Sequence, residues 1–338
     1  MTLNITWFIL VGVLLAGYAI LDGFDLGVGA LHLLVKSDDD RRLMLNAIGP
    51  VWDGNEVWLV TGGGAMFAAF PMVYATVFSG FYTAFMLLLI VLIFRAVAIE
   101  FRSKRDSRQW RQSWDISFSV SSIVISLLMG VALGNIITGI PLDVNGEYIG
   151  TFFTLLNPYT VLVGITTTAL FMMHGSIYAA MKTEGELHNQ VRGWINNSII
   201  FFVICYVTTT MATLIYFPQM VTHFKEYPVL FIVALLNILA IANIPREINK
   251  GKDFFAFLSS GANIAALFTL FAIGLFPNIV ISHPNPQYSL TLYNAASSQK
   301  TLSIMLTIAI IGLPFVLAYT LSIYWIFRGK VKLNKMSY

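Results

Sequence analysis

Long apolar runs recur along this chain, and they constrain its fold more than any other feature of the sequence. A run of 18 or more apolar residues is long enough to cross the hydrocarbon core of a bilayer as a helix. Hydrophobic residues make up 57% of the chain, and charged residues only 11%. The runs do not alternate apolar and polar residues, as the strands of a membrane barrel do. The sequence therefore predicts an all-α, polytopic integral membrane protein.

Nine transmembrane helices account for these runs. We expect them at residues 7–34, 50–70, 76–100, 116–138, 157–180, 194–216, 228–244, 254–281 and 301–327. No linker is long enough to separate a soluble domain, so we expect residues 1–338 to form a single transmembrane helical domain. Residues 1–6 carry no Lys or Arg, so no cleavable signal is expected. The one cysteine, Cys205, excludes an intrachain disulfide and a cysteine-based metal cluster.

The basic residues predict the orientation in the membrane. Of the 20 Lys and Arg residues, 17 follow the odd-numbered spans. The other side carries only Lys225 and Lys300, and Arg95 lies inside the third span. Under the positive-inside rule, this asymmetry puts the N-terminus outside and the C-terminus in the cytoplasm. The pI of about 8.9 follows from these loops and gives no reason to expect a nucleic-acid partner.

Two pairs of acidic residues interrupt the apolar runs. Asp22 and Asp25 lie in the first span, and Asp53 and Glu56 lie at the start of the second span. The spacing i,i+3 puts the members of each pair on one helix face. An ionisable group inside the bilayer costs about 2.5–3.5 kcal/mol on insertion scales, so these acids need a structural or functional reason.

The predicted topology brings these acids to similar depth. All four fall in the cytoplasmic half of the membrane, and Arg95 lies there too, two turns before the end of the third span. In a structural interpretation, Arg95 neutralises one acid, and the other acids cap helices or reach the interface. In a functional interpretation, the acids form a proton-uptake path from the cytoplasm, because carboxylates inside membranes commonly act as relays. The residue types and spacing leave both interpretations open.

Other residues are weaker candidates for a role. His174 lies in mid-span and is a candidate haem or metal ligand, but a lone histidine on an apolar face is more often a hydrogen-bonded part of the structure. Trp58 lies close to the acids and is a candidate to line a path for an apolar gas. Small residues let helices approach closely, which we expect at Gly62-Gly63-Gly64 and, in the first span, at Gly23, Gly27 and Gly29.

Two sequence blocks resemble subunit II of the cytochrome bd family of quinol oxidases. They are Leu-Asp-Gly-Phe-Asp-Leu-Gly-Val-Gly at 21–29 and Gly-Pro-Val-Trp-Asp-Gly-Asn-Glu-Val-Trp-Leu at 49–59. The resemblance covers almost the whole chain in order, through shorter blocks at 63–71, 94–95, 101–104, 155–159, 185–188 and 297–302. It implies a prokaryotic inner-membrane complex that oxidises quinol and reduces O2 to water.

The resemblance also implies roles for the subunit and its residues. It implies that this chain ligates no cofactor and forms a heterodimer with subunit I, which carries the quinol site and haems b558, b595 and d. It places Asp53 on a proton route and Trp58 and Arg95 on or near an oxygen route. His174 does not match a haem-ligand position of the family. Whether a small accessory subunit binds, and whether lipid or quinone occupies this subunit, stays open.

Two other classes of function remain as alternatives. A proton-coupled secondary transporter would show paired inverted repeats and broken helices near the midplane. The glycine-rich stretch 62–64 has no counterpart in the second half of the chain, which disfavours a transporter. The other alternative is a purely structural scaffold. It can be told apart from an oxidase subunit that carries protons only if Asp53 is dispensable.

Overall fold

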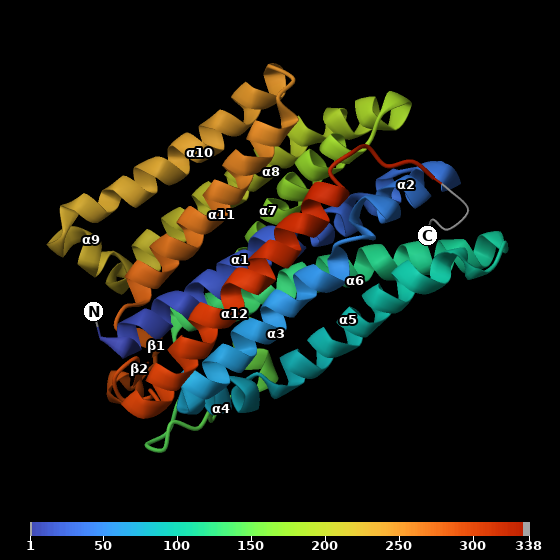
Figure 1. Cartoon of the computed structure of the whole chain (residues 1–338). Helices are drawn as coiled ribbons and strands as arrows, with labels where there is room; N and C mark the ends of the chain where they lie inside the picture. The colour runs from blue at the N-terminus through green and yellow to red at the C-terminus, as the bar shows by residue number, and fades with distance from the viewer. Residues whose placement is uncertain (1, 334–338) are drawn as a thin grey trace.

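The computed structural model describes residues 2–333, which fold into a bundle of long helices (Figure 1). The α-helices are α1 Leu3–Leu31, α2 Asp38–Ile48, α3 Trp52–Ala69, α4 Pro71–Gly80, α5 Tyr82–Phe101, α6 Arg108–Thr138, α7 Pro158–Lys182, α8 Gly185–Tyr216, α9 Thr222–Glu226, α10 Phe231–Asn249, α11 Asp253–Leu275 and α12 Gln299–Ile326. Short 3₁₀ turns are η1 His32–Leu34, η2 Arg102–Lys104, η3 Phe152–Leu155, η4 Pro218–Val221, η5 Pro228–Leu230 and η6 Pro286–Tyr288. Strands β1 Asn278–Val280 and β2 Leu290–Thr291 pair antiparallel.

Helix α1 forms the centre of the bundle, with α3, α6, α7 and α11 packed around it (Figure 1). Residues 22–29 are buried on every side. A Cβ atom on Gly27 would lie 1.8 Å from the carbonyl oxygen of Phe171, and one on Gly23 would lie 2.7 Å from the Phe171 ring. A Cβ atom on Gly29 would likewise clash with α6. The close helix approach predicted for the first span is therefore confirmed.

The matching prediction for the second span is wrong at two of its three glycines. Helix α3 runs through Gly62, Gly63 and Gly64 without a break. A Cβ atom on Gly62 would lie 3.1 Å from Leu15, but nothing lies within 4 Å of one on Gly63 or Gly64. Successive residues on a helix point about 100° apart, so only one of three adjacent glycines faces the neighbouring helix.

Eight of the described helices are long and apolar enough to cross a membrane: α1, α5, α6, α7, α8, α10, α11 and α12. Helix α3, which coincides with the second predicted span, is not among them, because Asp53, Asn55, Glu56 and its glycines lower its hydropathy. Its 18 residues span about 27 Å, close to the thickness of the hydrocarbon core. The start of α1 and the end of α12 lie at opposite ends of the bundle (Figure 1).

The fourth and sixth predicted spans begin earlier in the structure, at Arg108 and Gly185, and the third and eighth include residues that are not helical. The third span was expected to start at residue 76, but α4 ends at Gly80 and α5 starts at Tyr82, because glycine stabilises a helix poorly. The eighth was expected to reach residue 281, but α11 ends at Leu275 and residues 278–280 form β1. Pro277 lacks an N–H group and disfavours helical backbone in the residue before it.

The loops near the start of α1 contact one another. Ile140 forms a bridge with Ser282, which joins loop 139–156 to the segment after β1. Within the first loop, backbone N–H groups of Glu147 and Asn145 donate to the Asp143 carboxylate at 2.8 and 2.9 Å. These bonds, above all the one from Glu147, lower the pKa of Asp143.

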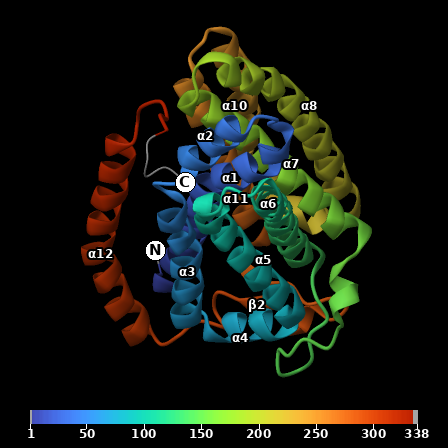
Figure 2. The same cartoon turned by 90° about the vertical axis from the view of Figure 1, so that its right-hand side faces the viewer.

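Helix α12 lies at one side of the bundle, beside α3 (Figure 2). Its first turn is anchored by buried Leu302, whose carbonyl accepts a hydrogen bond from Trp7 at 3.0 Å. Near its other end, Tyr324 reaches α3. Residues 313–319 between these anchors are exposed in the isolated chain. The two ends therefore fix the position of α12.

Candidate functional site

Arg95 on α5 joins α1 and α3 through two ion pairs. Its Nη2 donates to Asp22 Oδ1 at 3.0 Å, and its Nη1 donates to Glu56 Oε1. The side chains of Arg95 and Asp22 are fully buried, whereas that of Glu56 stays 24% exposed. The structure thus brings together one residue from each of the first three predicted spans.

Asp25 lies one turn beyond Asp22 on α1 and is held by an amide. Asn55 Nδ2 donates to Asp25 Oδ2 at 2.7 Å and to the Leu21 carbonyl at 3.1 Å. The Asn55 oxygen accepts from the Tyr324 hydroxyl at 2.9 Å, which fixes the orientation of the amide. We call Asp22, Asp25, Asn55, Glu56 and Arg95 the acid cluster.

Several buried polar atoms of the acid cluster have no hydrogen-bond partner within residues 2–333. They include Asp22 Oδ2, Asp25 Oδ1 and Arg95 Nε. For Asp22, the buried Tyr18 hydroxyl is an available donor. Asp25 Oδ1 either carries a proton itself or accepts a hydrogen bond from an ordered water. The three carboxyl groups also outnumber the single guanidinium, and uncompensated charge is costly in a low-dielectric interior. The unpartnered carboxyl oxygens and the excess of carboxyl groups over guanidinium are both properties expected of groups that gain and lose protons.

Asp53, the other predicted acid, lies outside this cluster. It is exposed in the first turn of α3, and no hydrogen bond or ion pair joins it to another described residue. Glu56 follows one turn later and points to Arg95. Asp53 therefore lies on the surface beside the one partly exposed member of the cluster.

Trp58 and His174 both contact α1. Trp58 covers Gly17, where an added Cβ atom would lie 2.5 Å from the indole ring. His174 Nδ1 is 2.8 Å from Ser260 Oγ, and its Nε2 is 3.0 Å from the Ile20 carbonyl oxygen. Since both ring nitrogens are hydrogen-bonded, His174 has none free for a haem. Within the described part of the chain, no group of three or more His, Cys, Asp and Glu residues is arranged to hold a metal.

A second buried ionic group lies where α1, α5 and α6 end or begin. Asp115 accepts from Arg102 Nε at 2.5 Å and from Arg41 Nη1 at 3.0 Å, and its Oδ1 is 2.6 Å from His32 Nε2. Arg102 also pairs with Asp38 at 2.8 Å. We call these five residues the Asp115 cluster. Its carboxylates are matched by cations, which suits a structural connection between helix ends.

Neither Tyr324 nor the Asp115 cluster was predicted from the sequence. His32 ends the first predicted span and Asp115 immediately precedes the fourth, and both fall on the same predicted side. Their positions on the same predicted side of the membrane could therefore have indicated that His32 and Asp115 form a pair. No comparable signal marks Tyr324, because its partner Asn55 lies 269 residues earlier in the chain.

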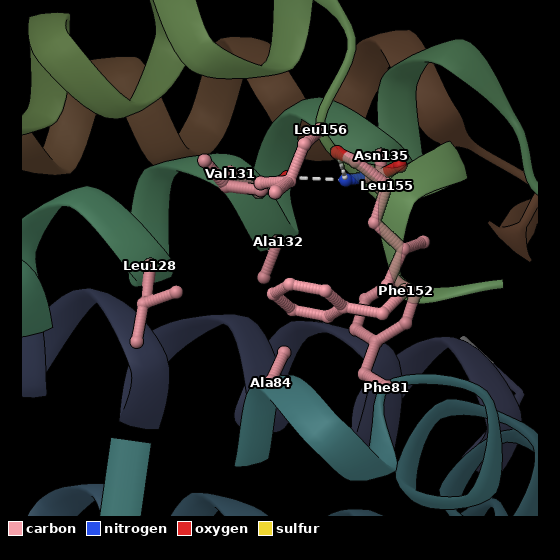
Figure 3. A pocket seen from close by; sticks show the side chains of 9 residues that line it. All are labelled: Phe81, Ala84, Leu128, Val131, Ala132, Asn135, Phe152, Leu155 and Leu156. Atoms are coloured by element: carbon pink, nitrogen blue, oxygen red, sulfur yellow. Dashed lines mark hydrogen bonds between the residues drawn. The ribbon is translucent and has the colours of Figure 1, made fainter. Parts of the chain in front are cut away.

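A small apolar pocket lies far from both clusters, between α5, α6 and η3 (Figure 3). Its volume is about 20 Å³, and Phe81, Leu128 and Phe152 contribute to its walls. Asn135 supplies a polar edge, but its Nδ2 already donates to the carbonyls of Val131 and Leu155, both at 2.8 Å. A pocket of this size holds about one water-sized molecule, not a cofactor.

Comparisons with known proteins agree on one family. Residues 3–327 match the family model described as cytochrome bd terminal oxidase subunit II. The cytochrome bd-I ubiquinol oxidase subunit 2 of Escherichia coli (strain K12) is 35% identical, over 97% of this chain and 95% of that protein. The cytochrome bd ubiquinol oxidase subunit 2 of Bacillus subtilis (strain 168) is 36% identical, over 98% and 97%.

The fold agrees with this relationship. The bd oxidase structure from Geobacillus thermodenitrificans matches with a TM-score of 0.78 at 16% identity, over 97% of this chain and 98% of that one. None of these relatives is a transporter, so the transporter alternative gains no support. The eight long apolar helices, together with the bacterial relatives, make this a multi-pass protein of the cytoplasmic membrane. The chain belongs to the cytochrome bd terminal oxidase subunit II family.

Proposed function

We propose that this chain is the haem-free half of a quinol oxidase heterodimer. The relative from Escherichia coli is named as a subunit of a ubiquinol oxidase. The resemblance to the family is the basis for placing haems b558, b595 and d in the partner, subunit I, and both ring nitrogens of His174, the candidate ligand in this chain, are hydrogen-bonded. The quinol site lies in that subunit as well. In this complex, quinol supplies the electrons that reduce O2 to water.

The proposed task of this subunit is to supply protons from the cytoplasm for water formation. The observation that carries this proposal is the acid cluster, in which three carboxyl groups share one guanidinium inside the bundle. Carboxyl groups with unpartnered oxygens can accept and release protons without a large change in structure. A network built only for stability would match its charges, as the Asp115 cluster does.

Within this path, each acid has a distinct position. Asp53, exposed beside Glu56, collects protons at the surface, and Glu56 lies between the surface and Arg95. Asp22 and Asp25 hold the deepest positions, at 0% exposure. Arg95 uses its two terminal nitrogens on Glu56 and Asp22, so we assign it to the proton path. Trp58 remains the candidate for an apolar wall of the oxygen route.

We also propose the nine-span topology, with α3 as the second crossing, the N-terminus outside and the C-terminus in the cytoplasm. Support comes from the start of α1 and the end of α12, which lie at opposite ends of the bundle, as an odd number of crossings between them requires. The basic residues of the loops support the same orientation. This orientation puts the partly exposed Glu56 and the exposed Asp53 on the cytoplasmic side of the acid cluster.

Purification with and without the partner tests the proposed function. The complex should show haem absorption and quinol-supported O2 consumption, and the isolated chain should show neither. Haem or oxidase activity in the isolated chain would contradict the proposal. A functional complex in which removal of this chain leaves the oxidase rate unchanged would also contradict it.

A further inference from the structure

A charged cavity of about 350 Å³ is lined by residues of α2, of α6 and of the connection from α5 to α6. Figure 1 shows the place of these elements in the bundle. Its lining is almost entirely ionic, with four basic and three acidic side chains. They are Lys36, Arg41, Arg108 and Arg111, and Asp38, Asp106 and Asp115. This volume is large enough for a small polar ligand.

The ion pairs in this cavity leave cations in excess. Asp115 is held by Arg41 and Arg102, so its charge is compensated at the floor of the cavity. Arg111 pairs with both Asp38 and Asp106, at 2.7 Å in each case. All three carboxylates of the lining are thus engaged by arginines.

Lys36 and Arg108 are the remaining cations of the lining. Both are exposed, and neither forms a hydrogen bond or ion pair with another residue among 2–333. Lys36 precedes α2, and Arg108 is the first residue of α6. The two cations therefore come to the cavity from different elements.

The position of the cavity identifies the kind of anion. It lies at the ends of the membrane-crossing helices α1, α5 and α6, where lipid headgroups meet the protein. Trp110 and Trp114 lie in the first two turns of α6, and tryptophan is enriched at this level of the bilayer. The most abundant anionic group there is the phosphate of a phospholipid.

We propose that this cavity binds the phosphate of an anionic phospholipid, with Lys36 and Arg108 as its direct contacts. Each cation near the membrane surface contributes about fivefold to the binding of an anionic lipid. Free inorganic phosphate presents the same chemistry, so an experiment must separate the two sources. The proposal is independent of the proton path, because its test measures bound lipid and not turnover.

The test uses the whole complex, reconstituted with phosphatidylglycerol and analysed by native mass spectrometry. A Lys36→Gln/Arg108→Gln double variant should retain at least about tenfold less phosphatidylglycerol than the wild type. Arg246→Gln/Lys252→Gln is the control, since it removes two positive charges from the end of α10 and the start of α11, outside the cavity. It should lose much less phosphatidylglycerol than the Lys36→Gln/Arg108→Gln variant.

Two further arms identify the source of the phosphate. Phosphatidylcholine carries the same phosphate but a compensating positive charge, so it should be retained weakly by both the wild type and the double variant. Excess inorganic phosphate should displace little phosphatidylglycerol from the wild type. Equal retention of phosphatidylglycerol by the wild type and the double variant would overturn the proposal. Full displacement by inorganic phosphate would overturn the assignment to a lipid.

Discussion

The two buried ionic clusters of this protein differ in charge balance: the acid cluster has an excess of carboxyl groups, whereas the carboxylates of the Asp115 cluster are matched by arginines. In the acid cluster, one arginine faces Asp22 and Glu56 while Asp25 is held only by a neutral amide. In the Asp115 cluster, one buried carboxylate faces two arginines and a histidine. Both lie within the same helical bundle, so burial alone does not explain the difference.

The difference in charge balance predicts how each cluster responds when one of its charges is removed. An excess carboxylate can bind a proton and become neutral, so the acid cluster can relieve its own imbalance. Arginine stays protonated, so the Asp115 cluster cannot relieve a loss of its acid. We therefore expect substitutions in the first cluster to affect turnover and substitutions in the second to affect assembly.

The largest expected effect on stability is that of Asp115→Asn. It leaves buried Arg102 with only the partly exposed Asp38 as a carboxylate partner and removes the partner of Arg41, so the cost should be up to about 3–5 kcal/mol, as for breaking a buried ion pair. The yield of assembled complex and its thermal midpoint should fall together, while turnover per haem of the assembled fraction stays normal. Asp106→Asn is the control, because Asp106 is fully exposed and should be dispensable for assembly. Normal yield for Asp115→Asn would remove the proposed contrast between the clusters.

A smaller loss of stability is expected for Arg95→Gln, although Arg95 is as deeply buried as Arg102. Its two partners become neutral by binding protons, so the remaining cost is that of lost hydrogen bonds, about 1–3 kcal/mol. The complex should assemble, but turnover per haem should fall. Assembly as poor as that of Asp115→Asn would show that both clusters are structural.

The smallest effect is expected for Tyr324→Phe, which removes one hydrogen bond to Asn55 and leaves the ring in place. A hydrogen bond contributes about 0.5–1.5 kcal/mol, so turnover per haem should fall about two- to tenfold. Tyr319→Phe, an exposed position on the same helix, is the control and should leave turnover unchanged. Equal turnover of the two variants would show that the orientation of the amide is unimportant.

Much of this arrangement was predictable, because the apolar runs and basic loops of the sequence indicate how deep each residue lies in the membrane. Apolar run lengths and alternating basic loops placed Asp22, Glu56 and Arg95 at one level, and the structure joins these three residues. The all-α membrane fold followed from the same signal. Close approach at Gly27 was predictable because the glycine is surrounded by other small and apolar residues.

The remaining features depend on rotation about the helix axes and on distant partners, which hydropathy does not encode. The i,i+3 spacing suggested that Asp53 and Glu56 share a face, yet only Glu56 points to Arg95. Gly63 and Gly64 point outward for the same reason. Tyr324 reaches Asn55 only because α12 returns to α3 at the end of the chain.

The most direct test of the central claim is turnover per haem in Asp25→Asn, Asp53→Asn and the double variant of the complex. Asparagine keeps the shape of the side chain but removes the group that carries a proton. We expect normal assembly and haem content, with quinol-supported O2 consumption at least about tenfold lower in the double variant, equivalent to about 1.4 kcal/mol on the limiting barrier. Unchanged turnover in the double variant would contradict a proton path through these acids and leave them a structural role alone.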